Sequence, residues 1–233
     1  MKLFINTGGK GVRLRPLTYE LPKPMIMLND KPVLHHIIDW GKKHGFTEFI
    51  FLNGYLHELI EGYFRNGEKF GVKIYHSNEP EPLGSAGPMK FAEKFIDSTF
   101  ALVQGDVYCD IDIKKMIEFH KKNNGIMTIL LHTSDHPEDS DVIQIDENNV
   151  VKNVIHKPGN RNFGNLTNAG LFIVEPKVLE YIRDGEKLDI EKDLYPRLIK
   201  AAERIIAYID NEGYIKDMGT IERFKKIEAY LNG

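Results

Sequence analysis

The sequence predicts an α/β protein with a doubly wound, mostly parallel sheet, to which a β-rich portion is added. Short apolar runs alternate with segments of helical periodicity up to about residue 134, and this alternation indicates crossovers between parallel strands. Beyond that point the pattern changes to hairpins and single strands. No linker or repeat separates the portions, so residues 1–233 are expected to form a single domain, with halves at 1–134 and 135–233.

Each expected strand of the first half is a short apolar run bounded by polar residues or glycine. The helices carry apolar residues at helical spacing, as in the segment that begins near Pro32 and ends near Gly45. Strands are expected at 2–6, 48–54, 72–77, 100–106 and 126–134. Helices are expected at 32–45, 56–67, 87–96 and 113–123.

The second half begins with an alternating pattern that is typical of a β-hairpin. Residues 141–159 contain two apolar stretches, and the residues at 147–149 are expected to form the turn between them. Further strands are expected at 166–176 and 204–210, and helices at 187–203 and 220–232. We expect this half to elaborate the sheet and to form either a lid or a wall of the substrate site.

Composition and charge exclude several classes of protein. Hydrophobic residues make up 42% and charged residues 28% of the chain, which is ordinary for a soluble globular protein. The net charge of −3 predicts no broad basic surface for nucleic acid or an anionic membrane. No apolar run approaches the ~18 residues of a membrane span. Cys109 is the single cysteine and cannot form an internal disulfide, so a cytoplasmic protein is expected.

A glycine-rich loop follows the first strand, in the segment NTGGKGVRLRPLTYELPKPM at residues 6–25. Glycines at this position let backbone amides approach an anion closely. The loop lacks the third glycine of G-x-G-x-x-G, and it departs from the P-loop because Val12 follows Gly11. Arg13 adds a planar guanidinium, and Lys23 adds a point charge between two prolines that stiffen the backbone. These groups together can hold a triphosphate.

The complete set of motifs resembles the sugar-1-phosphate nucleotidylyltransferases, which are also called nucleotide-sugar pyrophosphorylases. Their loop pattern is close to L-A-G-G-x-G-T-R-L-x-P-L-T followed by P-K-P. Further matches in this chain are EPLGSAGPMKFAEKF, VQGDV, HKP, NAGLFI and IKDMGT. The resemblance extends over about residues 2–231, and EPLGSAGP is most similar to the GDP-mannose pyrophosphorylases and heptose-1-phosphate guanylyltransferases.

The resemblance implies a Rossmann-like fold, the nucleotide-diphospho-sugar transferase fold, and a reaction between two phosphorylated substrates. An NTP and a sugar 1-phosphate give an NDP-sugar and pyrophosphate, with Mg²⁺ as cofactor. Such a reaction depends on positioning and charge neutralisation more than on a protein nucleophile. No nucleic acid or membrane partner is expected, and a homodimer is left open.

The resemblance also assigns roles to individual residues. Arg13 would stabilise the leaving pyrophosphate, and Lys23 would neutralise charge near the reacting phosphorus. Asp106 and Asp217 would hold Mg²⁺, which prefers one or two carboxylates together with phosphate and water oxygens. The backbone around the loop glycines would contact the nucleotide, and three residues would contact the sugar phosphate. The loop glycines are Gly8, Gly9 and Gly11, and the sugar-phosphate residues are Lys157, Asn168 and Gly170.

The base is expected to bind near a second motif. Glu79 stands where thymidylyl and uridylyl relatives carry a glutamine before a P-x-G turn, which is formed here by Pro82 and Gly84. A carboxylate only accepts hydrogen bonds, and guanine presents two neighbouring donors. The edge of uracil or thymine alternates acceptor and donor, and an amide matches it better. Glu79 therefore favours GTP.

Some positions depart from the family pattern. Thr7 and Val12 replace residues that are usually small or carry a hydroxyl, and Asn6 replaces an apolar one. His156 stands where many relatives have a glutamate before Lys-Pro, and Asp141 stands where many have a glycine. His156 and Asp141 are therefore candidate contacts to an atypical sugar, such as a heptose or a modified sugar, and a hexose remains an alternative.

Three functions remain open on the sequence alone. The leading hypothesis is a Mg²⁺-dependent guanylyltransferase that acts on mannose 1-phosphate or a heptose 1-phosphate. A second hypothesis changes the base and sugar, to a uridylyl- or thymidylyltransferase for glucose 1-phosphate. The third is a non-catalytic subunit that binds a nucleotide-sugar and regulates a partner. Arg13, Lys23, Asp106, Lys157 and Asp217 are all present, which disfavours the third hypothesis.

Overall fold

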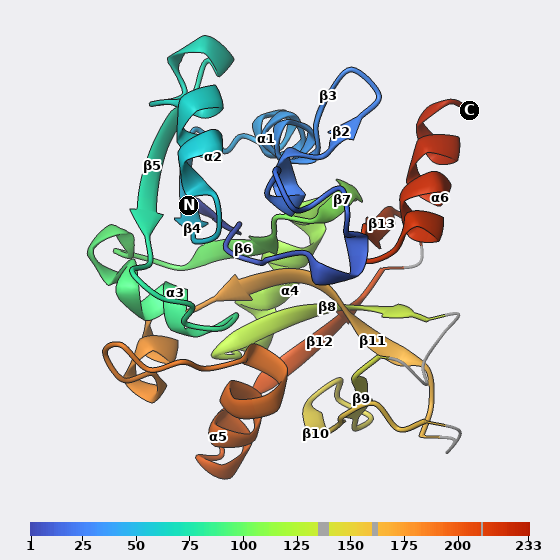
Figure 1. Cartoon of the computed structure of the whole chain (residues 1–233). Coiled ribbons are helices and arrows are strands. Elements are labelled where there is room, and N and C mark those ends of the chain that lie inside the picture. The colour runs from blue at the N-terminus through green and yellow to red at the C-terminus, as the bar shows by residue number, and fades with distance from the viewer. Residues whose placement is uncertain (135–139, 160–162, 211) are drawn as a thin grey trace. The chain divides into compact units, whose positions relative to one another are not determined.

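A computed structural model of the protein describes residues 1–134, 140–159, 163–210 and 212–233. The chain forms two compact units, each built from separated segments (Figure 1). The first unit comprises Met1–Pro82, Leu102–Ile111 and Tyr214–Gly233, and the second comprises Leu83–Ala101 and Asp112–Gly213. The chain therefore leaves the first unit and returns to it twice. A single domain with a division at residue 134 stays a prediction.

The first unit is built on parallel strands. Strand β1 (Leu3–Asn6) pairs in parallel with β4 (Glu48–Asn53), and β4 pairs in parallel with β5 (Lys73–Asn78). Strand β6 (Phe100–Gln104), which enters this unit at Leu102, lies on the other side of β1. Strands β1, β4 and β6 are largely buried because the interior strands of a parallel sheet are covered on both faces, whereas β5, at the edge, alternates buried and exposed residues. The parallel pairing expected for the strands at 2–6, 48–54 and 72–77 is thereby confirmed.

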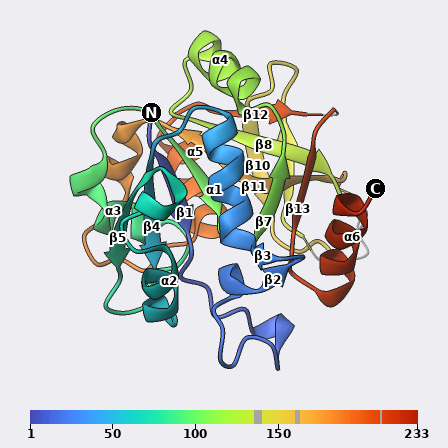
Figure 2. The same cartoon turned by 90° about the horizontal axis from the view of Figure 1, so that it is seen from above.

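Two helices pack against each other in this unit (Figure 2). Helix α1 (Val33–Lys43) directs His35 edge-on to Phe64 of α2 (His57–Phe64), with 6.4 Å between the ring centroids. The remaining short elements are a hairpin, which the sequence did not indicate, and three 3-10 turns. The hairpin strands are β2 (Met27–Leu28) and β3 (Lys31–Pro32), and the turns are Val12–Leu14, Lys23–Met25 and Glu68–Phe70.

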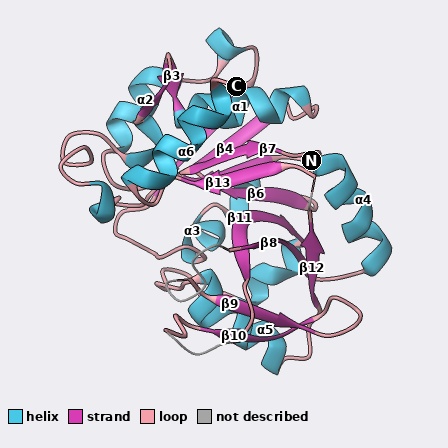
Figure 3. Ribbon diagram, turned by 90° about the vertical axis from the view of Figure 1, so that its right-hand side faces the viewer, coloured by secondary structure: helices cyan, strands magenta, loops and turns pink. Residues whose placement is uncertain are grey.

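A second, two-stranded sheet of the first unit joins residues that lie far apart in the sequence (Figure 3). Strand β7 (Val107–Asp110) pairs antiparallel with β13 (Tyr214–Asp217), and helix α6 (Ile221–Leu231) follows β13. The prediction that one strand runs to Asp106 is wrong. Strand β6 ends at Gln104, and Asp106 occupies the turn before β7.

The second unit contains a mixed group of strands. Strand β8 (Met127–Thr133) pairs antiparallel with β11 (Leu166–Val174) and in parallel with β12 (Ile205–Ile209). Strands β9 (Val142–Ile145) and β10 (Val151–Ile155) form the hairpin that the sequence predicted. The β-rich character expected for the later part of the chain is thus confirmed, and with it the predicted fold class.

The helices of the second unit are α4 (Ile113–Asn123), as predicted, and two that are shorter than predicted. The segment 87–96 divides into α3 (Gly87–Phe91) and a 3-10 turn. The segment 187–203 contains a π-helical turn, Ile190–Leu194, which leads into α5 (Tyr195–Lys200). Pro196 lacks the N–H that would continue a regular helix through this junction. A further 3-10 helix spans Pro176–Tyr181.

The described part of the chain contains no helix with the length and apolarity needed to cross a bilayer.

Candidate active site

The glycine loop leaves β1 and turns sharply at Gly11. The backbone of Gly11 has a φ of 59°, and its carbonyl accepts a hydrogen bond of 2.8 Å from the Thr18 hydroxyl. A Cβ at this position would lie 2.9 Å from Thr18 Cγ2 and 3.2 Å from Lys23 Cβ. Gly11 is therefore required both by its left-handed backbone and by the chain that folds back over it. The loop brings the Lys23 side chain close to Gly11, and the phosphate-binding role of both stays a prediction.

Lys23 and Asp106 form an ion pair in the first unit. Lys23 is 8% exposed and sits at the start of the 3-10 turn that follows Pro22. Its ammonium group contacts Asp106 Oδ2. Lys23 is predicted to neutralise charge near the reacting phosphorus, and Asp106 is predicted to bind the metal. The structure brings the two side chains into contact, although 83 residues separate them in the sequence.

Asp217 ends β13, directly opposite Val107, so it lies beside Asp106. The backbone N–H of Met218 donates to the Asp106 carbonyl at 2.8 Å, which fixes the two segments together. Arg223 Nη1 donates to both oxygens of Asp217, at 2.9 and 2.8 Å. Burial alone would raise the pKa of Asp217, but the charges of Arg223 and Lys23 outweigh it and lower the pKa below its ordinary value.

Arg13 reaches the same turn as Arg223. A Cβ on Gly219 would lie 3.2 Å from Arg13 Nη2 and 3.3 Å from Arg223 Nη1. The sequence motif did not identify Arg223 as part of this site. The sequence contains one cue to its position, because threonine is a preferred residue at the start of a helix. In the structure Thr220 caps α6 and accepts from the Arg223 N–H at 3.2 Å, so Arg223 lies in the first helical turn.

The carboxylates of this cluster fit a magnesium ion by their chemistry. Asp106 and Asp217 supply the one or two carboxylates that Mg²⁺ uses in proteins, and substrate phosphates and water would complete its coordination. Among the described residues, no group of three or more His, Cys, Asp or Glu side chains could hold a metal alone. A metal at this position would therefore depend on the substrate for most of its ligands.

Glu79 follows β5 and faces the glycine loop. Its backbone N–H donates to the Asn53 carbonyl at 3.0 Å. Its carboxylate lies over two glycines, because a Cβ on Gly8 or Gly54 would come within 2.9 or 2.5 Å of Glu79 Oε1. The predicted base contact therefore lies beside the predicted phosphate loop. Gly9 borders open space, with nothing within 4 Å of a Cβ placed there, and Pro82 is exposed.

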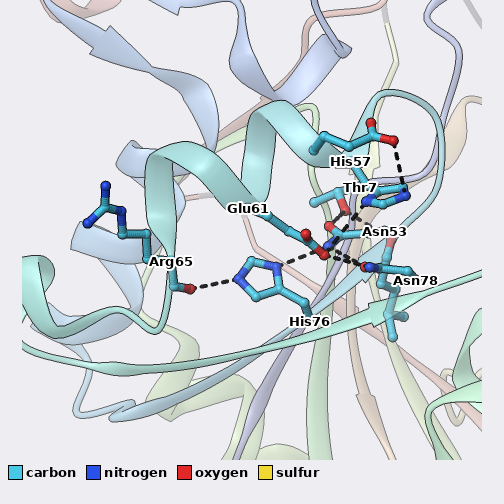
Figure 4. A network of polar contacts seen from close by, with 9 residues as sticks. Thr7, Asn53, His57, Glu61, Arg65, His76 and Asn78 are labelled. Carbon is cyan, nitrogen blue, oxygen red and sulfur yellow. Dashed lines mark hydrogen bonds and ion pairs between the residues drawn. The ribbon is translucent and has the colours of Figure 1, made fainter.

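A polar network lies behind the glycine loop and explains Thr7 (Figure 4). Thr7 is fully buried, and its hydroxyl is 2.7 Å from Asn53 Oδ1 and 2.9 Å from the Leu52 carbonyl. Asn53 Nδ2 contacts His76 Nδ1 and Asn78 Oδ1, both at 3.0 Å. Thr7 is thus a structural anchor that joins the first residues of the loop to β4 and β5.

The network reaches the surface at α2. Asn78 Nδ2 donates to Glu61 Oε1 at 2.5 Å, and His76 Nε2 lies 2.7 Å from the Arg65 carbonyl. His57 Nδ1 is 3.6 Å from Glu61 Oε1. Since Asn53 also accepts the Glu79 backbone N–H, the network fixes the segment that carries Glu79. Asn53, which the motifs did not identify, therefore helps to position Glu79.

In the second unit, Asp141 organises the His-Lys segment. Its Oδ1 lies 2.6 Å from His156 Nδ1 and accepts a 3.3 Å hydrogen bond from the Lys157 backbone N–H. Lys157 has a φ of 38°, which is uncommon for a residue with a side chain, and its side chain is exposed. Asp141 and His156 thus hold Lys157 in an unfavourable backbone conformation, as is typical of functional sites.

The Asn-Ala-Gly motif forms a bulge in β11. The pairing register with β8 shifts between Asn168 and Phe172. Within the bulge, Asn168 Oδ1 accepts from the Gly170 N–H at 2.9 Å, and Asn168 Nδ2 donates to Glu191 Oε1 at 2.5 Å. A bulge of this kind redirects a side chain away from the regular alternation. Asn168 is thereby directed toward Glu191, which the motifs did not identify.

Gly84 packs against a distant backbone in the second unit. The Leu188 carbonyl accepts from Ala86 N at 2.8 Å, and the Leu188 N–H donates to the Leu83 carbonyl at 2.9 Å. Gly84 has a φ of 80° and lies so close that a Cβ would be 2.4 Å from the Leu188 carbonyl oxygen. Gly84 therefore joins two segments of this unit, whatever its role toward the base.

Tyr195 has a buried hydroxyl that finds no hydrogen-bond partner within the described segments. Burial raises the pKa of this phenol well above its ordinary value. We expect Tyr195→Phe to raise the free energy of unfolding by about 1 kcal/mol, because it removes an unpaired polar group and leaves the ring in place. Chemical denaturation would measure this. A loss of stability would instead indicate a partner for the hydroxyl, and Tyr181→Phe is the control because its hydroxyl donates to Glu203 at 2.7 Å.

A comparison with protein families identifies the chain. The family model described as "Nucleotidyl transferase" matches residues 3–232. The chain belongs to the nucleotidyl transferase family. This membership confirms the resemblance predicted from the sequence motifs.

Individual members of the nucleotidyl transferase family extend the comparison. The mannose-1-phosphate guanyltransferase of Yarrowia lipolytica is 37% identical over 229 residues, which cover 96% of this chain and 62% of that protein. The UTP–glucose-1-phosphate uridylyltransferase of Synechocystis sp. is 35% identical, and the match covers 85% of this chain and 55% of that protein. The chain therefore spans roughly three fifths of the length of these relatives or less.

The fold also matches solved nucleotidyl transferase structures. HddC from Yersinia pseudotuberculosis has a TM-score of 0.85 at 26% identity, and the match covers 99% of each chain. Its complex with GMP-PN has a TM-score of 0.84 at the same identity. The predicted fold class is confirmed by these matches. The roles of the individual site residues stay predictions.

Proposed function

We propose that the chain transfers a nucleoside monophosphate from an NTP, preferably GTP, to a sugar 1-phosphate of the mannose or heptose type. The observation that supports this most is the clustering of opposite charges in the first unit. Arg13 and Arg223 meet Asp217 at one turn, and Lys23 pairs with Asp106. Guanidinium and ammonium groups suit phosphate oxygens, and the paired carboxylates suit Mg²⁺.

The reaction would proceed by in-line displacement at the α-phosphorus. A phosphate oxygen of the sugar 1-phosphate forms a bond to that phosphorus as the bond to the pyrophosphate oxygen breaks, so pyrophosphate carries the leaving electron pair. We assign Arg13 to the charge that develops on the leaving pyrophosphate, and Lys23 to the oxygens of the α-phosphate. A Mg²⁺ ion held by Asp106 and Asp217 would supply further charge neutralisation.

Lys157 is the proposed anchor for the phosphate of the second substrate. Its exposed ammonium group is a point charge that suits a phosphate dianion. Asp141 and His156 hold the segment that carries it. The backbone amides of Gly8, Gly9 and Gly11 remain the proposed contacts to the nucleotide phosphates.

The preference for GTP rests on Glu79 and on the relatives. The carboxylate beside Gly8 can accept hydrogen bonds from two neighbouring donors on guanine, which uracil does not offer. The Yarrowia relative is named a guanyltransferase, and the HddC structure binds GMP-PN. The Synechocystis relative is named a uridylyltransferase, so UTP with glucose 1-phosphate is the second candidate.

A panel assay tests the proposal. Pyrophosphate release is measured for GTP, UTP and dTTP, each combined with mannose 1-phosphate, heptose 1-phosphates and glucose 1-phosphate, with and without Mg²⁺. We expect the highest kcat/KM for GTP with a mannose-type or heptose-type substrate, and dependence on Mg²⁺. Tight nucleotide binding without turnover of any pair would instead support a regulatory subunit. We also propose a homodimer, and a cytoplasmic location because the sequence has the single cysteine Cys109 and so no internal disulfide.

The role of Glu79 in base choice can be tested by one substitution. We expect Glu79→Gln to lower kcat/KM for GTP by roughly 10- to 100-fold, because an amide replaces one acceptor with a donor that faces guanine. The value for UTP should change much less. Steady-state assays with both nucleotides measure the ratio, and Glu81→Gln on the same exposed loop is the matched control. An unchanged GTP-to-UTP ratio in Glu79→Gln would remove Glu79 from base recognition.

A further inference from the structure

Glu191 is a carboxylate in the second unit that the mechanism above does not use. It lies on the π-helical turn Ile190–Leu194 and is partly exposed. Its Oε1 accepts a 2.5 Å hydrogen bond from Asn168 Nδ2. Within the described ranges no Lys, Arg or His forms an ion pair with it. A carboxylate with only limited access to water usually has a cationic partner, so its position calls for another explanation.

The surroundings of Glu191 are acidic and limit its access to water. Burial raises the pKa of Glu191, the nearby carboxylates of Asp141 and Asp189 raise it further, and the Asn168 hydrogen bond only partly offsets the rise. Tyr195, one helical turn beyond, presents its unpaired hydroxyl near the same group. Thr167 pairs with Val142, so Asn168, which donates to Glu191, lies near Asp141, which accepts from the Lys157 N–H. Glu191 therefore lies near the segment that carries Lys157, consistent with the effect of Asp141 on its pKa.

The side-chain amide of Asn168 is held in place by hydrogen bonds to Gly170 and Glu191. Its carbonyl oxygen already accepts the Gly170 N–H, and one amide hydrogen is donated to Glu191. The bulge in β11 therefore fixes the amide, and the amide in turn fixes the carboxylate. The oxygen atoms of Glu191 are the acceptors that this arrangement presents to a ligand, and Asn168 acts as a positioning residue.

The charge of Glu191 selects the kind of group that it can bind. A phosphate would be repelled, whereas neutral hydroxyl groups can donate to both carboxylate oxygens. A sugar 1-phosphate carries both kinds of group, with one phosphate and several hydroxyls. Lys157 attracts the phosphate and Glu191 accepts from hydroxyls, so the two residues together define the direction in which such a molecule binds.

We propose that Glu191, oriented by Asn168, accepts hydrogen bonds from ring hydroxyl groups of the sugar 1-phosphate and thereby contributes to the choice of sugar. This inference rests on the proposed function and adds a specificity residue that the sequence motifs do not contain. Because His156 is engaged by Asp141, Glu191 also supplies an acceptor that His156 does not provide.

The first test compares Glu191→Gln with wild-type protein in steady-state assays. We expect KM for the sugar 1-phosphate to rise roughly 10- to 100-fold, because hydrogen bonds to a charged acceptor are replaced by weaker ones. KM for GTP should stay unchanged. Glu180→Gln is the matched control, since Glu180 is an exposed glutamate of the same unit. An equal rise in both KM values, or no rise in either, would overturn the assignment.

The second test identifies the contact itself. Sugar 1-phosphates that each lack one hydroxyl are assayed with wild-type protein, Glu191→Gln and Asn168→Ala. If Glu191 binds a given hydroxyl, removing that hydroxyl lowers kcat/KM strongly for wild type and much less for either variant, because the effects are not additive. Additive losses for every hydroxyl would show that Glu191 has only a structural role. Thermal unfolding of each variant establishes whether it is folded. If Glu191→Gln does not fold, the comparison is made with Asn168→Ala instead.

The outcomes also separate this proposal from the one on which it rests. Turnover by wild type together with an unaffected Glu191→Gln variant would overturn the role of Glu191 alone. Failure of wild type to use any sugar 1-phosphate would overturn the proposed function and the Glu191 assignment with it.

Discussion

Asp106→Asn is expected to lower kcat/KM by about 10³-fold at saturating Mg²⁺. Asparagine has the same size but lacks the negative charge, so it binds Mg²⁺ poorly. The same change leaves the nearly buried Lys23 ammonium without its carboxylate. We therefore expect a loss of about 2 kcal/mol in the free energy of unfolding as well.

Two measurements separate these effects. Pyrophosphate release reports catalysis, and urea denaturation reports stability, and both are carried out on Asp106→Asn and on a control. Asp110→Asn is the matched control, because Asp110 ends the same strand β7 and accepts from the exposed Tyr230 hydroxyl at 2.9 Å. The control should remain within about threefold of wild type, as surface substitutions usually do. Activity of Asp106→Asn within tenfold of wild type would rule out Asp106 as the metal ligand.

Gly84→Ala is expected to destabilise the protein by about 4 kcal/mol. The left-handed backbone of Gly84 costs a residue with a Cβ roughly 1–2 kcal/mol. The added Cβ would also lie 2.4 Å from the Leu188 carbonyl oxygen and 2.8 Å from its carbon. These are backbone atoms that hold two segments together, so they cannot move away without breaking hydrogen bonds, and overpacking adds roughly 1–3 kcal/mol.

Gly185→Ala provides the control for this prediction. Gly185 also has a left-handed backbone, with a φ of 69°, but nothing lies within 4 Å of a Cβ built there. Its substitution therefore carries only the conformational cost, about 1 kcal/mol. Chemical denaturation of both variants measures the difference. Equal losses would show that the contact with Leu188 relaxes without cost.

The sequence predicted much of the fold because local patterns determine most of it. Strands β1, β4 and β5 are apolar runs followed by polar or glycine-rich turns, and each was located to within a residue or two. The sequence analysis predicted neither strand β7 nor strand β13, nor their pairing. Each has only four residues, and their pairing depends on a contact between positions about 100 residues apart, which no local periodicity records.

The candidate site was predictable where a motif fixes both residue type and spacing. Gly11, Lys23, Asp106 and Asp217 were named as candidates in this way, and the structure places all four in one unit. Arg223, Glu191 and Asn53 were missed, because their roles arise from side chains that meet only after folding. Thr7 was noted as a departure from the family pattern, yet its buried hydroxyl has a structural partner in Asn53.

The segmented first unit has a consequence for biosynthesis. Asp106 and Asp217 belong to the same unit, but the second unit lies between them in the sequence. During translation, which proceeds from the N-terminus, a nascent chain exposes the glycine loop, Lys23 and Asp106 long before β13 leaves the ribosome. The edge of β7 stays without its partner strand throughout this interval, and such an edge can pair with other chains. Any chaperone that assists this protein would therefore be needed most while the second unit is being synthesised.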